Sequence, residues 1–358
     1  MWPYWILFLV PAALALTRLT PAKETWRTSR LSDTWRVALV MLIIMIGLRH
    51  EVGGDWETYI EMLESYKDSS ESVKYGFHDP AYILLNILAI WSGLGVYFPN
   101  LICAAFFSWG LVVFCITQPR PWLALAVAVP YLITVVAMGY TRQGAAIGIA
   151  MLAIVSLSQR STLRFIFWIA LAALFHKSAI VLVPMALLAN NKRRAFTFLW
   201  VALTCVVLYL LLLQESIDIL IHGYIESQYQ SSGAAIRIAM NAMPAAMFLM
   251  LRKRFQLEPA QQSFWSWMSL SALLFIILLK VSPSSTAVDR VALYWIPLQL
   301  FVLARLPNVL GPKNGKNALW VCAVVAYSAT VHFVWLTFAD TAFAWLPYQF
   351  YPWVWLWQ

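Results

Sequence analysis

Long unbroken apolar stretches constrain this chain more than any other feature of its sequence. Segments 37–48 and 198–213 consist almost only of hydrophobic side chains. A helix needs about 20 apolar residues, with a range of roughly 17–25, to span a bilayer, whereas a membrane β-barrel alternates apolar and polar residues. The sequence therefore predicts an all-α polytopic integral membrane protein with about 12 transmembrane helices, some of them broken or re-entrant. The apolar stretches lie at 2–16, 35–48, 80–98, 99–117, 122–140, 143–158, 163–189, 196–213, 236–251, 264–281, 290–305 and 318–338.

Composition excludes the soluble alternatives. Hydrophobic residues make up 62% of the chain and charged residues 11%, against about 45–50% and about 25% in ordinary soluble domains. A cytosolic enzyme, a nucleic-acid-binding domain and a disordered chain are therefore excluded. We expect residues 1–358 to form a single membrane domain surrounded by the lipid bilayer, with no nucleic-acid partner. The four cysteines, Cys103, Cys115, Cys205 and Cys322, lie in apolar stretches without metal-ligand spacing, so we expect buried small side chains and no metal.

The charged loops predict an orientation. Lysine and arginine concentrate in 17–36, 191–194, 252–254 and 305–316, while the segment 49–79 is strongly acidic. Because cytoplasmic loops of membrane proteins are enriched in lysine and arginine, we expect the basic segments to be cytoplasmic. The acidic segment 49–79 then forms one outer loop, and 214–235 forms a second.

Two topologies satisfy this orientation. In the first, every apolar stretch crosses once, which leaves Arg120, Arg160 and Arg164 outside. In the second, 80–98 is an interfacial or re-entrant helix, and 163–189 divides into two short helices at His176. We favour the second because it keeps those three arginines inside. It also avoids the cost of several kcal/mol for placing His176 and Lys177 in the middle of a lipid-facing helix. A broken helix at membrane depth is tolerated where it lines protein or a cavity.

The first outer loop carries the acidic candidates. Gly53 and Gly54 permit a tight turn just before Asp55 and Glu57, and Tyr59 follows four residues after Asp55. Asp55 is either a general base or part of a solvated acidic loop. Later, Asp79 stands directly before Pro80, a pattern typical of a residue that caps the start of a helix.

The cationic candidates occupy three further places. Arg142, followed by Gln143, opens a helix rich in small residues. It either reaches the lipid headgroups or binds a diphosphate through its two guanidinium nitrogens. His176 and Lys177 interrupt a long apolar stretch, which is difficult to explain by packing.

Asp289 and Arg290 form the third place, just before the apolar stretch 290–305. They either pair with each other, or Arg290 completes a cationic site with Arg142. Arg237 is a weaker candidate for the same role. The sequence has no Walker A, HExxH or Gly-x-Ser-x-Gly pattern, so nothing in it indicates a cofactor.

These pieces together resemble the EpsG/Wzy-type family of bacterial polysaccharide polymerases. The matching pieces are Arg49 with the stretch 54–59, Arg142-Gln143, the stretch 175–178 and Asp289-Arg290, with Asp79-Pro80 where the family pattern has Glu-Pro. The resemblance implies an enzyme of the bacterial inner membrane with a fold like that of the GT-C glycosyltransferases and an active site toward the periplasm. Its substrates would be oligosaccharide repeat units linked to undecaprenyl diphosphate, and a chain-length regulator would be a partner.

The resemblance also suggests roles for the candidates. Asp55 and His176 are the expected catalytic residues, with Asp55 favoured as the base. Arg142, Lys177 and Arg290 are expected to bind the diphosphate. The expected supporting residues are Arg49, Glu57, Tyr59, Gln143, Arg237 and Asp289. The C-terminal aromatic residues 345–357 either hold sugar or form an interfacial belt. The alternatives to a polymerase are a flippase for lipid-linked sugars and a glycan ligase.

Overall fold

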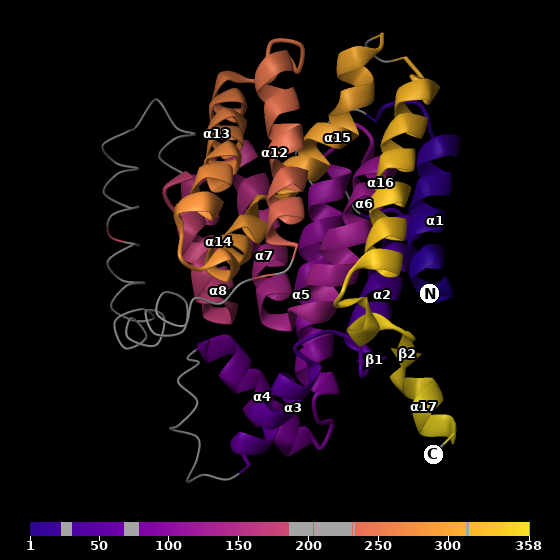
Figure 1. Ribbon diagram of the computed structural model, residues 1–358, viewed down its shortest axis with the longest axis vertical. Coiled ribbons are helices and arrows are strands. Elements are labelled where there is room, and N and C mark those ends of the chain that lie inside the picture. The colour runs from indigo at the N-terminus through magenta and orange to yellow at the C-terminus, as the bar shows by residue number, and fades with distance from the viewer. Residues whose placement is uncertain are drawn as a thin grey trace.

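A computed structural model describes residues 1–22, 31–67, 79–185, 203, 231, 233–312 and 315–357. Almost all of this part of the chain is helical (Figure 1). The elements in chain order are α1 Trp2–Thr17, α2 Asp33–Gly47, β1 Arg49–His50, α3 Trp56–Ser65, α4 Pro80–Ser92, α5 Tyr97–Ile116, α6 Pro121–Ala128, the π-helical η1 Val129–Ala137, α7 Thr141–Ser158, α8 Thr162–Phe175, η2 Lys177–Leu182, α12 Ala234–Leu251, α13 Pro259–Val281, α14 Ser285–Ala292, η6 Leu293–Trp295, α15 Ile296–Leu310, α16 Ala318–Phe338, η7 Ala342–Trp345, β2 Gln349–Phe350 and α17 Tyr351–Trp357.

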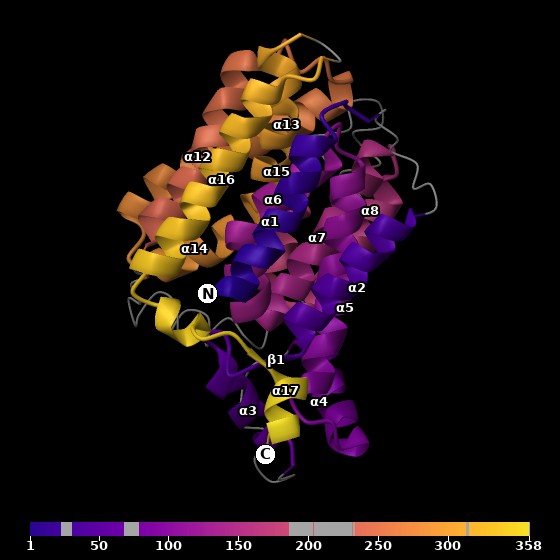
Figure 2. The same cartoon turned by 90° about the vertical axis from the view of Figure 1, so that its right-hand side faces the viewer.

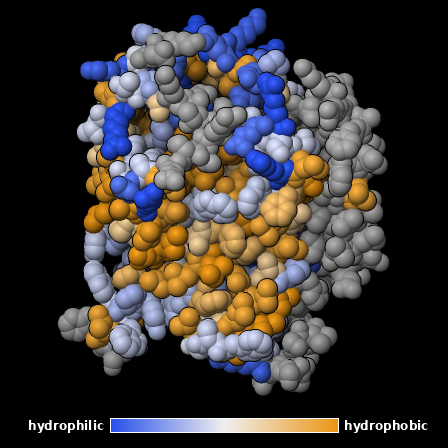
Figure 3. Space-filling model, turned by 180° about the vertical axis from the view of Figure 1, so that it is seen from behind, coloured by the Kyte–Doolittle hydropathy of each residue, from blue (hydrophilic) through white to orange (hydrophobic). Residues whose placement is uncertain are grey.

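The helices confirm the predicted all-α membrane protein. In the described ranges, six helical segments are long and apolar enough to cross a membrane: α5, α7, α12, α13, the joined α14–α15 segment and α16. Four shorter apolar segments join them, namely α1, α4, α6 with η1, and α8. On the face in Figure 3, hydrophobic residues occupy the middle of the molecule and hydrophilic residues gather toward its two ends. This distribution is typical of a protein with a lipid-facing belt.

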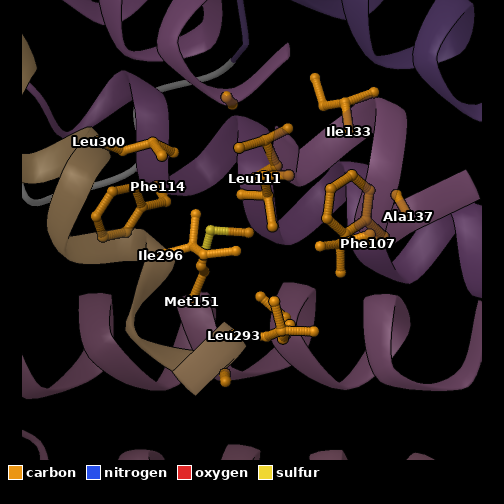
Figure 4. Packing of buried hydrophobic residues seen from close by; sticks show 14 of the residues in the cluster. Phe107, Leu111, Phe114, Ile133, Ala137, Met151, Leu293, Ile296 and Leu300 are labelled. Atoms are coloured by element: carbon orange, nitrogen blue, oxygen red, sulfur yellow. The ribbon is translucent and has the colours of Figure 1, made fainter. Parts of the chain in front are cut away.

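The core lies where α5 and α7 cross. A Cβ on Gly110 of α5 would stand 1.8 Å from the carbonyl oxygen of Gly148 in α7, so only glycine allows this close approach. Side chains from α5, η1, α7, η6 and α15 fill the surrounding space (Figure 4). The labelled examples are Phe107, Leu111, Phe114, Ile133, Ala137, Met151, Leu293, Ile296 and Leu300.

The molecule has two chemically different ends. At one, which we call the loop end, β1, α3 and α4 lie together beyond the helical bundle (Figures 1 and 2). At the other, which we call the basic end, Arg120 of the α5–α6 turn donates hydrogen bonds to Asn308 of α15 and to the Gly315 carbonyl. The connection 252–258 between α12 and α13 also lies there (Figure 1).

The predicted break in 163–189 is present. Helix α8 ends at Phe175, His176 has extended backbone angles, and the short helix η2 begins at Lys177. The predicted helix 80–98 is shorter than expected, because α4 ends at Gly93 in the left-handed conformation with φ +69° and α5 begins at Tyr97. Whether α4 re-enters the membrane stays a prediction.

Several expectations fall outside the described residues. They are the apolar stretch 196–213 with Cys205, most of the second loop 214–235, and positions 68–78 of the first loop. Of the other cysteines, Cys103 and Cys115 are buried as expected. The expectation was wrong for Cys322, which is exposed on α16, a helix that turns much of its apolar surface outward.

The C-terminal segment returns to the first loop. Strand β2 pairs antiparallel with β1, so that Arg49 faces Phe350 and His50 faces Gln349. Just before it, Trp345 is buried and donates a hydrogen bond of 2.7 Å to the Thr134 carbonyl. This indole therefore anchors the chain end inside the protein rather than in an interfacial belt.

Candidate functional site

The first loop is attached to the helical bundle by Arg49. This side chain is 1% exposed, and its guanidinium donates to the carbonyls of Ile46 at 2.6 Å and Val52 at 3.1 Å. It also donates to the Thr141 hydroxyl at the start of α7, at 2.6 Å. Arg49 therefore connects the loop before Asp55 to the helix that carries Arg142.

Gly53 lets this loop pack tightly against the bundle. Its φ of +110° is unfavourable for other residues, and a Cβ there would lie 2.3 Å from the Met138 carbonyl oxygen. Its N–H donates to the Ala344 carbonyl at 2.8 Å, so the C-terminal segment holds the same turn. This packing fixes the backbone just before Asp55.

Asp55 forms an ion pair with Arg290. Its Oδ2 lies 3.9 Å from an Nη2 of Arg290, and the two side chains are 31% and 26% exposed. The Arg290 guanidinium lies 3.9 Å from the centre of the Tyr140 ring, a cation–π contact. Burial raises the pKa of the Asp55 carboxyl, while Arg290, Arg142 and Arg49 act in the opposite direction. A raised pKa makes this carboxylate a stronger proton acceptor.

Arg142 is engaged by a different carboxylate. Its Nη1 lies 2.8 Å from Oδ2 of Asp79, and the two side chains are 14% and 9% exposed. Its guanidinium also lies 5.9 Å from the centre of the Tyr59 ring and 5.6 Å from that of Tyr82. Asp79 is the N-cap residue of α4 and Pro80 follows it at the first helical position, as predicted, but its side chain makes no capping hydrogen bond, because the carboxylate turns to Arg142.

Lys177 joins the same group. Burial raises the pKa of the Asp79 carboxyl, whereas the charges of Arg142 and Lys177 and the backbone N–H of Lys177 lower it. The break after α8 therefore places the first residue of η2 beside the carboxylate that holds Arg142. This juxtaposition links η2 to the start of α4.

His176 is held in one orientation by Ser178. The Ser178 backbone N–H donates to Nδ1 of His176 at 3.4 Å, and the Ser178 hydroxyl lies 2.6 Å from the same nitrogen. Because a backbone N–H can only donate, Nδ1 is an acceptor, and the neutral ring carries its proton on Nε2. The electrostatic field at His176 includes contributions from Arg142, Arg290 and Lys177. His176 is thus oriented to donate a hydrogen bond from Nε2.

Asp289 does not pair with Arg290. Its carboxylate instead accepts two hydrogen bonds from Arg237 of α12, at 2.7 Å from Nε and 2.5 Å from Nη2. The Ser231 hydroxyl donates to it as well, at 3.1 Å. This bidentate pair fastens α12 to α14. Among the residues that the structure describes, Arg290 forms its ion pair with Asp55.

Most of the predicted residues therefore meet at the loop end. The positive charges of Arg142 and Arg290 both interact electrostatically with Asp55 and with His176. Gln143 donates from Nε2 to the Arg290 carbonyl at 2.6 Å, which joins α7 to α14. Glu57 differs from the others, because it is exposed on α3.

Three contributors were missed by sequence reasoning. Tyr140, Tyr82 and Tyr294 supply ring faces or a hydroxyl to the site, the last at 3.4 Å from the Ser178 hydroxyl. Their positions near Arg142, Asp79 and Arg290 in sequence were a usable signal. Trp345 was among the predicted C-terminal aromatic residues, but its buried position was not predictable, because it depends on the return of the C-terminal segment to β1.

The arrangement combines excess positive charge with one exposed carboxylate. Arg49, Arg142, Lys177 and Arg290 outnumber Asp55 and Asp79, while Arg237 and Asp289 balance each other. Such a site can bind an anion and accept a proton beside it. In the described ranges no group of three or more His, Cys, Asp or Glu side chains is arranged to hold a metal ion.

Comparison with known proteins gives one match. A family model described as the EpsG family matches residues 34–350, a range that contains every residue of the site. No curated protein and no solved structure matches the chain.

Proposed function

The chain belongs to the EpsG family, and from this premise we propose that it is a polysaccharide polymerase with its active site at the loop end. The reaction transfers a growing glycan from undecaprenyl diphosphate to a hydroxyl of a lipid-linked repeat unit. The observation that carries the proposal is the pairing of a partly exposed carboxylate, Asp55, with a partly exposed guanidinium, Arg290, at 3.9 Å. Transfer from a diphosphate to a hydroxyl needs a base for the acceptor and a cation for the leaving group.

The cations stabilise the leaving group. The bond between the anomeric carbon and the diphosphate oxygen breaks, and its electron pair stays on the diphosphate. Arg290 is the principal ligand of that charge, because its carboxylate partner is 3.9 Å away and 26% of its side chain is exposed. Arg142, which lies 2.8 Å from Asp79, and Lys177 support Arg290 through their positive charges.

Asp55 accepts the proton of the acceptor hydroxyl. As the acceptor oxygen bonds to the anomeric carbon, its proton moves to the Asp55 carboxylate, which becomes a neutral acid. His176 donates from Nε2 to the sugar or to the diphosphate, consistent with the acceptor state of its Nδ1. In this scheme His176 orients a substrate and Asp55 is the base.

The proposal includes a place in the cell. The loop end faces the periplasm or outside of a bacterial inner membrane, and the basic end faces the cytoplasm, in agreement with the charges of the loops. The likeness to GT-C glycosyltransferases is part of the same proposal. The test uses single cysteines in a cysteine-free background at two exposed positions, Glu57 and Arg254. An impermeant thiol reagent added outside spheroplasts should label position 57 and spare position 254; the reverse pattern would refute the orientation.

The function is tested with purified protein in detergent. Given only lipid-diphosphate-linked repeat units, it should build a ladder of longer glycans without nucleotide sugar or ATP, because the glycosyl-diphosphate bond already stores the driving force. A ladder that requires nucleotide sugar would refute the proposal. Movement of the lipid between leaflets without a ladder would favour a flippase, and transfer only to a different acceptor would favour a ligase.

A further inference from the structure

A cleft separates α1 from α2 on the surface of the bundle. A cavity of about 160 Å³ lies between the two helices and has α6 and the start of η1 as its floor. Its lining is almost wholly apolar, with Leu7, Val10, Ala38 and Met41 on the walls and Trp122 at the floor. The cavity is long and open to the side, as a site for a hydrocarbon chain must be.

A second cavity continues from the first at the basic end. It has a volume of about 200 Å³ and is lined by Arg18, Arg120, Trp35 and Trp122, among others. Trp122 lines both cavities, so the two adjoin. No carboxylate is among the lining residues that the structure describes.

One wall of the basic cavity contains Arg120, whose position is fixed by hydrogen bonds. Arg120 donates to the Leu19 carbonyl, to the Asn308 side-chain oxygen and, at 2.9 Å, to the Gly315 carbonyl. All three acceptors are neutral, so its positive charge is held in place without being cancelled. Trp35 stacks on Trp122 with ring centres 4.1 Å apart, and the Arg18 guanidinium lies 5.8 Å from the Trp122 ring centre.

We propose that these two cavities form one binding site for an anionic phospholipid. The phosphate lies between Arg18 and Arg120, and one acyl chain follows the apolar cleft between α1 and α2. Charge complementarity selects the anionic lipid, because the head-group end is lined by two cations and, among the residues that the structure describes, by no carboxylate. The site lies at the basic end, away from Asp55 and Arg290, so the proposal does not depend on the polymerase reaction.

The test is native mass spectrometry of the purified protein, titrated with phosphatidylglycerol or phosphatidylcholine of identical chains. One phosphatidylglycerol molecule should be retained more tightly than phosphatidylcholine. Arg18→Gln should weaken that binding about fivefold and weaken phosphatidylcholine binding less, because the phosphatidylcholine head group carries no net charge. Arg254→Gln, an exposed arginine outside both cavities, is the matched control and should bind as the wild type does.

A second variant tests the acyl chain. Ala38→Phe fills the apolar cleft and should weaken both lipids alike, provided that size-exclusion chromatography shows a folded protein. Equal binding of the two lipids, or an unchanged Arg18→Gln variant, would overturn the proposal. Displacement of phosphatidylglycerol by undecaprenyl phosphate at equal concentration would also overturn it, by assigning the cleft to a polyprenyl chain.

Discussion

Both ends of the helical bundle bury arginine, but the partners differ. At the basic end, Arg120 donates to carbonyl and amide oxygens, and Arg305 donates to the side-chain oxygen of Gln118. At the loop end, Arg142 meets Asp79 at 2.8 Å and Arg290 lies 3.9 Å from Asp55. Arg120 and Arg305 therefore donate to neutral acceptors, as Arg49 also does at the loop end, whereas Arg142 and Arg290 have carboxylate partners.

The kind of partner that an arginine has decides whether its surroundings are suited to binding or to chemistry. A neutral oxygen fixes an arginine and leaves its charge in place, so the basic end is suited to hold an anion or to fasten helices together. A carboxylate beside a cation can also accept a proton, which the transfer reaction requires. In the proposed function the chemistry belongs to the loop end, and the following predictions test that assignment.

The largest effect is expected at Asp55. Asp55→Asn keeps the size of the side chain but removes its basicity, so polymerisation should fall by about 10²–10⁴-fold, the usual contribution of a general base. Glu57→Gln, on the same helix but exposed to solvent, should stay near the wild-type rate. The measurement is ladder formation per folded molecule in detergent. Equal losses in the two variants would mean that loop charge, rather than a specific base, is required.

An intermediate effect, on stability alone, is expected at the basic end. Arg305→Gln removes the hydrogen bond to Gln118 and the contact with the Phe301 ring, 4.0 Å from the guanidinium carbon. It should lower the free energy of unfolding by about 2 kcal/mol, the usual value for a hydrogen bond from a charged group. Thermal unfolding in detergent measures this, with Arg254→Gln as the exposed control. A loss of activity per folded molecule in Arg305→Gln would contradict the claim that the basic end takes no part in the chemistry.

The smallest effect is a shift in pH dependence. The base must be ionised, so activity falls as the pH drops through the pKa of Asp55, which burial raises above its ordinary value of 3.8. Arg290 lowers this pKa, so in Arg290→Gln the acid limb of the residual activity should move to higher pH. Rates measured across the acid range in both proteins check the direction. An unmoved or lowered limb would exclude Asp55 as the titrating group that Arg290 controls.

The sequence predicted the helices better than the contacts. Apolar length located most of the spans, and the pair His176-Lys177 correctly predicted the break after Phe175, because an ionisable pair is costly inside an apolar helix. The turn at Gly53, just before Asp55, was also predicted, since a glycine turn can be recognised from its local pattern.

Partners across the fold were not predictable in the same way. Asp79 stands at the start of α4 as expected, but the partner of its carboxylate, Arg142, is 63 residues away and was not predicted. Asp289 had two open interpretations, and its partner is Arg237, which is 52 residues away. Each choice depends on which helices become neighbours, and local pattern carries no information about that. Trp345 is the extreme example, because it reaches Thr134 from a position 211 residues later.

The central claim is that Asp55 carries out the chemistry while Arg290 binds the diphosphate. Equilibrium binding of a fluorescent lipid-diphosphate-linked repeat unit to purified Asp55→Asn and Arg290→Ala proteins tests it most directly. Asp55→Asn should bind as tightly as the wild type without forming a ladder, and Arg290→Ala should bind at least about tenfold more weakly, as expected for the loss of a charged hydrogen-bond donor. Equal loss of binding in both variants, or wild-type binding by Arg290→Ala, would contradict the account.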